Sequence, residues 1–299
     1  MLDHTINAFE ANAKFQEAMR GDSQHHERDV WKKITINHFP DGVEAFIDEA
    51  KYTWRDGAAF ETPEDLRSEK AERGEGDRAK NIERAGRRAK TNVRRLCKML
   101  KADCMMTLTT RENIQDYGRM DGLFKAFRSR LEAIGGLTYV ATYELQKRGA
   151  IHIHIACQQF PAWLKNEHGV RVKSYALISS IWSRVVGRGN GNVNFTKPRG
   201  RNSCHRIASY ISKYVTKQFS KLIDPLTGKV DEERFNEKKY RASRDIPKPR
   251  VTVMWFAGDT PTWDLVSMLA QDFKLNGYSD IAQYSDSLNQ FHWFAASKP

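Results

Sequence analysis

The segment Ala150–Ala156, Ala-Ile-His-Ile-His-Ile-Ala, restricts the fold of this chain more than any other. Isoleucine and histidine alternate, and a period of two is typical of a β-strand whose successive side chains point to opposite faces. The isoleucines would pack on one face, and His152 and His154 would share the other. Two imidazoles on one rigid strand can bind a divalent cation, although an ordinary polar sheet face is the alternative.

The residues before this strand supply a third candidate ligand. Residues 147–149, Lys-Arg-Gly, predict a three-residue hairpin loop, because glycine tolerates the positive φ that such loops often need. A hairpin centred on Arg148 places Glu144 opposite His152, and cross-strand partners point to the same face. Glu144, His152 and His154 would therefore converge. Two nitrogens and one carboxylate predict a Mg²⁺ or Mn²⁺ site with positions open for phosphate oxygens.

A second informative segment spans residues 210–217, Tyr-Ile-Ser-Lys-Tyr-Val-Thr-Lys. In a helix, Tyr210 and Tyr214 lie on one face, and Lys213 and Lys217 each follow a tyrosine by three residues. A tyrosine hydroxyl is a weak nucleophile, with a pKa of about 10, so attack on a phosphodiester needs a polarising cation or a nearby ammonium. Simple packing of two tyrosines is the alternative, but the joint occurrence with the His-x-His strand favours phosphodiester chemistry.

Charge points to an anionic partner. The 299 residues carry a formal net charge of +12, which favours nucleic acid before membrane. Between residues 82 and 100, apolar residues recur at helical spacing and arginines occupy much of the remaining surface, so this helix either contacts phosphates or is a solvated surface helix. The candidate nucleic-acid-binding residues are Arg84, Arg87, Arg88, Arg94, Arg95 and Arg148.

Helical and strand-like segments alternate along the rest of the chain, which predicts an α+β fold with an antiparallel sheet and helices on one face. Residues 1–80 are interpreted as a helical extension followed by a charged linker, residues 81–256 as the principal domain, and residues 257–299 as a helical tail. The expected strands are 104–110, 137–145, 150–157, 192–195 and 251–256, and the expected helices are 82–100, 122–133, 174–186 and 204–219, with a further helix opened by residues 260–261.

The cysteines and the apolar segments bear on location. The four cysteines have neither a CxxC pair nor zinc-site spacing, so we expect reduced thiols rather than a disulfide framework. The first residues lack an apolar signal core, and no run approaches the roughly 20 apolar residues that span a bilayer. These features predict an intracellular protein without a membrane partner.

Three motifs, in order, resemble those of the HUH endonucleases, in particular the two-tyrosine rolling-circle replication initiators of small single-stranded-DNA phages and plasmids. Met105–Thr110, Met-Met-Thr-Leu-Thr-Thr, is similar to the first motif. His152-Ile153-His154 is similar to the second, and Tyr210–Lys217 to the third in its two-tyrosine form. The resemblance covers roughly residues 84–253.

The resemblance implies a five-stranded antiparallel palm of the RRM or ferredoxin type, within an endonuclease domain at 81–256. The histidines would lie on its central strand, and the tyrosine helix would pack beside it. By the same resemblance, Glu144, His152 and His154 are expected to bind the divalent metal ion, with no nucleotide cofactor. Tyr210 and Tyr214 would be the nucleophiles, and Lys213 and Lys217 would assist them.

The activity implied by this resemblance is site-specific nicking of single-stranded or hairpin origin DNA. One tyrosine would attack the phosphate, retain the 5′ end as a phosphotyrosine and release a 3′-OH primer. The second would attack the regenerated junction, and strand transfer would reclose a circle. No GxxxxGK[ST] run is present, so the expected partners are a host helicase and a polymerase, in the cytoplasm of a bacterial cell.

Three alternatives remain open. A two-tyrosine transposase or a relaxase would use the same chemistry, although the modest length, the lack of zinc-binding cysteines and the lack of a three-histidine cluster weigh against them. A non-catalytic single-stranded nucleic-acid-binding module would use Tyr210 and Tyr214 for stacking. A divalent-metal hydrolase with a water nucleophile would tolerate phenylalanine at both tyrosine positions.

Overall fold

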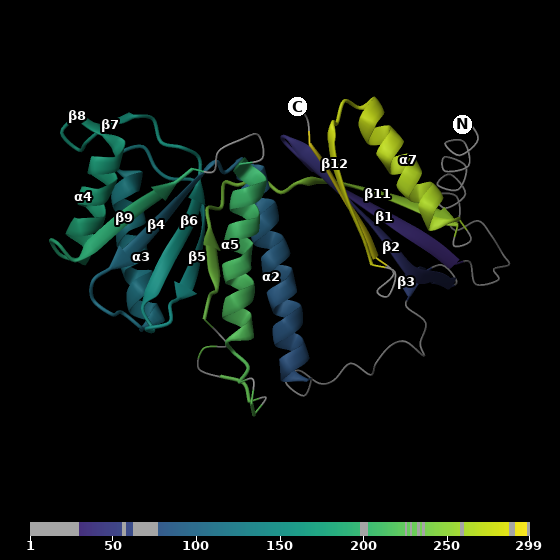
Figure 1. Ribbon diagram of the computed structural model, residues 1–299, viewed down its shortest axis with the longest axis horizontal. Helices are drawn as coiled ribbons and strands as arrows, with labels where there is room; N and C mark the ends of the chain where they lie inside the picture. Colours follow the sequence, from purple (N-terminus) through teal and green to yellow (C-terminus); the bar gives the residue numbers. More distant parts are fainter. Residues whose placement is uncertain are drawn as a thin grey trace. The chain divides into compact units, whose positions relative to one another are not determined.

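The chain divides into two compact units. A central unit is continuous, from Gly76 to Lys248, and a terminal unit combines Met1–Glu75 with Pro249–Pro299. All expected catalytic residues lie in the central unit. The computed structural model describes residues 30–55, 58–61, 77–197, 203–224, 226–227, 229–231, 234, 237–257, 260–286 and 291–297 (Figure 1).

The central unit contains a five-stranded sheet in which every neighbouring pair is antiparallel. The strand that carries both histidines, β6, is the middle one, as the resemblance implies. The α+β class and the five-stranded antiparallel sheet are therefore confirmed. In spatial order the strands are β10 (Tyr240–Ala242), β5 (Tyr139–Leu145), β6 (Ile151–Cys157), β4 (Cys104–Thr110) and β9 (Gly191–Thr196).

Helices cover both faces of this sheet. α3 (Tyr117–Glu132) and α4 (Ser174–Val186) pack on the face that carries Ile151, Ile153 and Ile155. α2 (Arg78–Leu100) and α5 (Ser203–Ser220) lie on the histidine face (Figure 1). The expectation of helices on one face was wrong, because the histidine-bearing face also carries small apolar residues that pack against Ile207, Ile211 and Val215 of α5; these residues are Val140 and Ala156.

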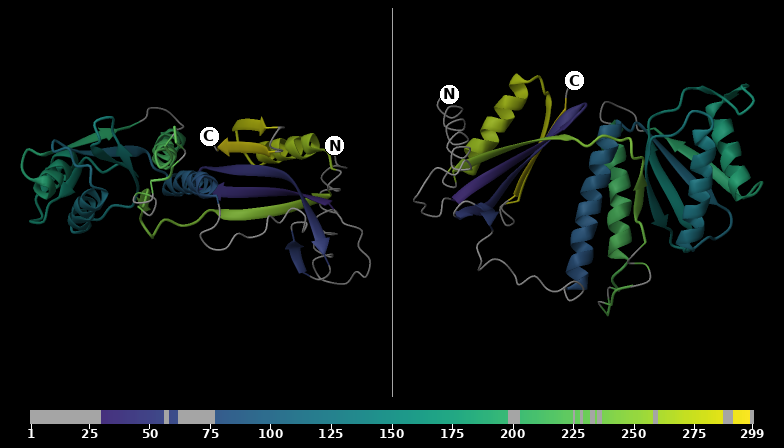
Figure 2. Two further views of the ribbon diagram at one scale, coloured as in Figure 1. Left: turned by 90° about the horizontal axis from the view of Figure 1, so that it is seen from below. Right: turned by 180° about the vertical axis from the view of Figure 1, so that it is seen from behind.

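α2 and α5 run side by side (Figure 2). Gly86 permits their close approach, since a Cβ at this position would lie 3.1 Å from the Cβ of Phe219. Local signals define the ends of α2: the Asp77 carboxylate accepts a hydrogen bond from the Lys80 backbone N–H, and Lys101 ends the helix at φ 53°. Among the described residues, no helix has the length and apolar character needed to cross a membrane.

A short hairpin precedes α4. Its strands, β7 (Trp163–Lys165) and β8 (Arg171–Lys173), form a separate two-stranded sheet. Sequence analysis did not predict them, because runs of three residues are too short to show a clear period.

The terminal unit is built on an antiparallel sheet of its own, with one helix packed on it. Ile34, Ile47 and Phe294 from the sheet meet Leu265 and Phe273 from the helix in a separate core. The strand order is β11 (Arg250–Ala257), β1 (Val30–Phe39), β2 (Gly42–Arg55), β13 (Phe291–Ser297) and β12 (Asp280–Asp286), with β3 (Ala58–Glu61) paired to β2 and the helix being α7 (Thr262–Leu275).

Three expectations about the chain ends were wrong where the structure describes them. Residues 30–61 form strands rather than helices, and the alternation of Ile34 and Ile36 with polar residues suits that structure. The expected helical tail contains α7 but also β12 and β13. The strand expected at 251–256 belongs to the terminal unit, because β11 pairs with β1. Most of the expected charged linker, residues 62–76, lies outside the described residues.

Candidate active site

The hairpin between β5 and β6 has the predicted register. Glu144 pairs with His152, and Thr142 pairs with His154. The intervening loop contains Gly149 at φ 88°, a left-handed conformation that favours glycine. On the other side of β6, Thr107 of β4 pairs with His154. A short loop therefore places a carboxylate, two imidazoles and two hydroxyls on one face of the sheet.

His154 is held by a partner on each ring nitrogen. Its Nε2 lies 2.8 Å from Glu144 Oε2, and its Nδ1 lies 3.1 Å from Thr107 Oγ1. Burial lowers the pKa of His154 below the ordinary value, despite the opposing effect of Glu144, so the neutral imidazole is favoured. The carboxylate can only accept, so Nε2–H donates to Glu144 and Nδ1 accepts the hydroxyl proton of Thr107.

Glu144 is shared between the sheet and α5. Its Oε2 accepts from His154, and its Oε1 accepts from Lys217 Nζ at 3.0 Å. Burial raises the pKa of Glu144, but the hydrogen bonds from His154 and Lys217 outweigh burial and leave the pKa below its ordinary value. Glu144 is therefore a carboxylate at neutral pH.

His152 has one partner and one unused nitrogen. Its Nδ1 lies 2.8 Å from the Gln146 amide nitrogen, whereas its Nε2 is buried without a hydrogen-bond partner. Burial and the neighbouring His154 lower the pKa of His152. Within the described ranges, no three His, Cys, Asp or Glu side chains are arranged to hold a metal ion. Glu144 and His154 are thus in contact while His152 is bound to Gln146, and the three-ligand metal site stays a prediction.

The two tyrosines project from α5 toward this face. Tyr214 stacks on His154, with ring centroids 4.4 Å apart and planes 14° apart. Tyr210 meets the same imidazole edge-on at 6.1 Å and is 43% exposed. The Tyr214 hydroxyl donates a hydrogen bond to the Tyr210 hydroxyl. Burial raises the pKa of Tyr214, and this hydrogen bond adds to the increase.

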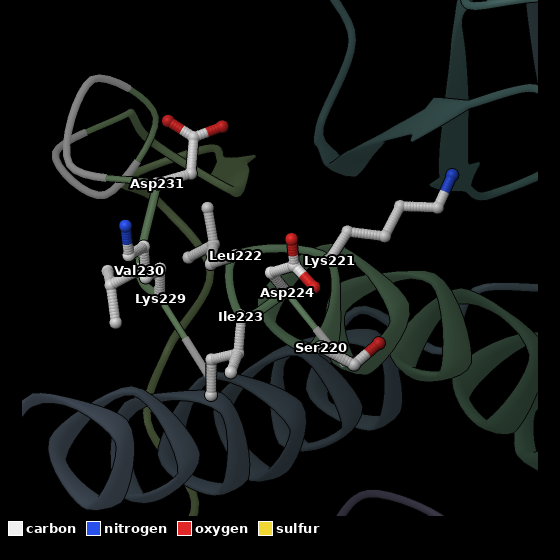
Figure 3. Close-up of a pocket in the computed structure, with 8 residues that line it drawn as sticks. All are labelled: Ser220, Lys221, Leu222, Ile223, Asp224, Lys229, Val230 and Asp231. Atoms are coloured by element: carbon white, nitrogen blue, oxygen red, sulfur yellow. The ribbon is translucent and has the colours of Figure 1, made fainter. Parts of the chain in front are cut away.

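The two lysines differ as much as the two tyrosines. Lys217 contacts Glu144, whereas Lys213 is exposed and lines a pocket beside Tyr210 together with Lys90 of α2. One turn after Lys217, Lys221 Nζ donates to the Leu145 carbonyl at 2.9 Å. Figure 3 shows the Lys221 side chain extending away from the pocket that residues 220–224 and 229–231 line, toward the strands. Lys217 and Lys221 therefore fasten α5 to the end of β5.

Sequence analysis missed four residues around this site. Thr107, Gln146 and Lys221 contact the expected ligands or their strand, and Lys90 lies beside Tyr210. Period-two spacing from Glu144 would have placed Gln146 on the same face, and the four-residue repeat of lysines continues from 213 and 217 to 221. No local signal connects Lys90 with Tyr210, because they are distant in the sequence.

The expected nucleic-acid-binding arginines are distributed along α2 and at the hairpin tip. Arg84, Arg87 and Arg88 are exposed, and Arg87 pairs with Glu83 at 2.5 Å. Arg94 and Arg95 are half-buried. Arg148 is exposed close enough to His152 to contribute to its lowered pKa. Their contact with nucleic acid stays a prediction.

Comparison with known proteins gives one match, over the segment that contains this site. Residues 103–219 match a family of replication-associated proteins, the ORF2 type. The match includes β4, both histidines and both tyrosines but less than half of the chain, and it is consistent with a Rep-type replication initiator. Neither the search of curated proteins nor the search of solved structures found a significant match.

Proposed function

We propose that this protein initiates rolling-circle replication by nicking and rejoining single-stranded DNA through its tyrosines. The observation that carries the proposal is the contact of Tyr214 with His154 beside the Glu144–Lys217 pair. A pair of tyrosines that only packed would not need an ionised carboxylate and an ammonium beside it. The family match over residues 103–219 supports a role in replication.

The reaction is a transesterification. A tyrosine oxygen attacks the phosphorus and forms a phosphotyrosine ester with the 5′ side of the break. The bond from phosphorus to the 3′ oxygen breaks, and that oxygen leaves as a 3′-hydroxyl after taking a proton, while the phenolic proton goes to solvent. Lys217 can stabilise the developing negative charge, because its ammonium already lies within the site. Since the ester conserves the bond energy, the second tyrosine can reverse the step on a new strand without ATP.

The residues fit a divalent cation. Two buried polar atoms on this face have no hydrogen-bond partner, His152 Nε2 and Thr142 Oγ1. The donor set of Glu144, His152 and His154 consists of one carboxylate and two imidazoles kept neutral by burial. A cation held by these three residues would polarise the scissile phosphate.

Two proton positions must change for the imidazoles to act as ligands. His154 presents a lone pair at Nε2 only when its proton moves to Nδ1, where Thr107 Oγ1 can accept it. His152 presents a lone pair at Nε2 when Nδ1 carries the proton, which the Gln146 amide oxygen can accept after the amide turns over. Thr107 and Gln146 are therefore positioning residues in this proposal.

A denaturing gel tests the proposal. The substrates are labelled single strands that tile the DNA molecule encoding this chain, incubated with the full protein and MnCl₂. A 3′-end label should migrate with the denatured protein, and a 5′-end label should appear in a shorter free strand that a polymerase can extend. Tyr210→Phe, Tyr214→Phe, the double variant and His152→Ala run in parallel, with EDTA as the metal-free control.

The outcomes separate the candidate activities. An adduct that requires Mn²⁺ and is absent from the double variant supports the proposal. Cleavage without an adduct, unchanged in the double variant, would contradict it and favour a hydrolase with a water nucleophile. Binding without cleavage would favour a non-catalytic module. A transposase or relaxase would also form an adduct, so the position of the nicks relative to a replication origin distinguishes these from an initiator.

A further inference from the structure

The hairpin of β7 and β8 presents one strongly basic face. Trp163 pairs with Lys173 and Lys165 pairs with Arg171, so these four side chains share a face. Leu164 and Val172 point to the opposite face and pack against the core of the central unit. The hairpin is therefore anchored from below, and its outer face is left to one tryptophan and three cations.

This outer face is open to solvent. All four residues are exposed, and Trp163 has 46% of its surface accessible. The Arg171 guanidinium lies over the Trp163 ring, 5.9 Å from its centroid. The acidic residue of the hairpin loop, Glu167, is paired with Arg184 of α4 at 3.1 Å, on a side chain outside this face. The face thus combines a charge of +3 with an exposed aromatic ring, and nothing in the proposed nicking reaction uses it.

We propose that this face, formed by Trp163, Lys165, Arg171 and Lys173, binds single-stranded nucleic acid separately from the tyrosine site. The three cations would contact phosphates, and Trp163 would stack on an unpaired base. A duplex would satisfy the cations but offers no free base face to the tryptophan, so an unpaired strand fits better. Each strand rises about 3.3 Å per residue, so the face has room for only a few nucleotides.

The position of the hairpin gives this contact a use. Figure 1 places β7 and β8 beside α4, whereas the tyrosines project from α5 on the opposite face of the sheet. A strand held at the hairpin would therefore be retained away from the nucleophiles. The inference does not depend on nicking, because charge and exposure alone support it.

Fluorescence anisotropy of the full-length protein with labelled oligo(dT) of 15 nucleotides tests this inference. EDTA is present throughout, so that no cleavage occurs, and KCl is varied. One variant combines Lys165→Gln, Arg171→Gln and Lys173→Gln. Its matched control removes three exposed lysines elsewhere, with Lys229→Gln, Lys248→Gln and Lys274→Gln, for the same change in net charge. Trp163→Ala and Trp163→Phe test stacking, and thermal melts confirm folding.

We expect the hairpin variant to bind at least tenfold more weakly than the wild type. Its dependence of log K on log salt should be shallower by about 2, the slope for three phosphate contacts on a single strand. Trp163→Ala should weaken binding by about fivefold or more, and Trp163→Phe should recover most of the loss. Equal losses in the matched control would overturn the inference, as would full binding by Trp163→Ala or an equal effect of every variant on a blunt duplex.

Discussion

The imidazole of His154 and the phenol ring of Tyr214 stack face to face, with centroids 4.4 Å apart. This contact joins the central strand of the sheet to α5. The preceding tyrosine, Tyr210, approaches the same imidazole edge-on at 6.1 Å and is largely open to solvent. Two Tyr-x-x-Lys repeats that are indistinguishable in sequence are therefore different in structure.

From this asymmetry we predict that Tyr214 makes the first cleavage. Its ring is held beside Glu144 and His154, so less ordering is needed to bring its oxygen to a phosphate bound there. Tyr214→Phe should keep the stacking but lower the rate of first-strand adduct formation by about 10²-fold or more. Tyr210→Phe should lower that rate by less than tenfold, as measured on single-turnover denaturing gels.

Rejoining provides the control for this ranking. Tyr210→Phe should form the first adduct and then fail to transfer it to a second strand, if the tyrosines act in turn. The ranking is wrong if Tyr210→Phe loses the first adduct and Tyr214→Phe retains it.

Lys217 and Lys213 should also differ when each is replaced. Lys217→Met removes an ammonium 3.0 Å from Glu144, so the carboxylate loses a competing cation. We expect this variant to bind Mn²⁺ several-fold more tightly, measured by electron paramagnetic resonance, while nicking falls by about 10²-fold because charge stabilisation is lost.

Lys213→Met is the matched control, because it removes the same charge from the same helix without touching Glu144. It should leave the affinity for Mn²⁺ unchanged. Equal metal affinities for both variants would show that the Lys217 contact does not govern access to Glu144.

Two glycines of the central unit should respond in opposite directions to alanine. At Gly191, an added Cβ would lie 2.6 Å from Val186 and 2.7 Å from the buried Trp182, so Gly191→Ala should destabilise the protein by about 1–3 kcal/mol. At Gly122 in α3, the Cβ meets nothing within 4 Å, so Gly122→Ala should add up to about 1 kcal/mol. Urea unfolding measures both, and a stable Gly191→Ala variant would contradict the packing described.

The buried Asp121 should make stability depend on pH. Its carboxylate accepts hydrogen bonds from Arg241 and from Tyr143, the latter at 2.7 Å, and it lies 3.0 Å from Lys125. Burial raises the pKa of Asp121, but these partners outweigh burial and lower it overall. Since the folded pKa lies below the unfolded value of about 3.9, the ionised group stabilises the fold above that pH and this contribution is lost as the pH falls through the folded pKa.

Asp121→Asn should therefore cost roughly 3 kcal/mol at pH 7, because it leaves Arg241 without its counter-charge. The difference between wild type and variant should shrink as the pH falls below about 4. Denaturant unfolding at several pH values checks this, and a constant difference between pH 7 and pH 3 would contradict it.

Short-range patterns allowed much of the central unit to be predicted. The period of two in β6 and the three-residue loop before it predicted the pairing of Glu144 with His152, because a hairpin register depends on few residues. The helical spacing of the arginine-rich segment predicted α2, and that of the tyrosine segment predicted α5.

Other features depend on contacts between distant residues. β1 pairs with β11 more than 200 positions later, so the amphipathic pattern of β1 alone did not reveal a second sheet. The helices that cover the histidine face were not predicted, since the sequence does not say which apolar surface α5 will choose.

The amino-acid sequence by itself determined which residues carry the chemistry and which of them share a strand or helix face, because side-chain direction follows the local backbone period. Only the tertiary structure decided that Tyr214 rather than Tyr210 stacks on His154, and that Lys217 rather than Lys213 reaches Glu144. The physical reason is that packing α5 against β5 and β6 fixes the rotation and height of that helix. A repeat within the helix cannot encode these, since each of its copies satisfies the local pattern equally well.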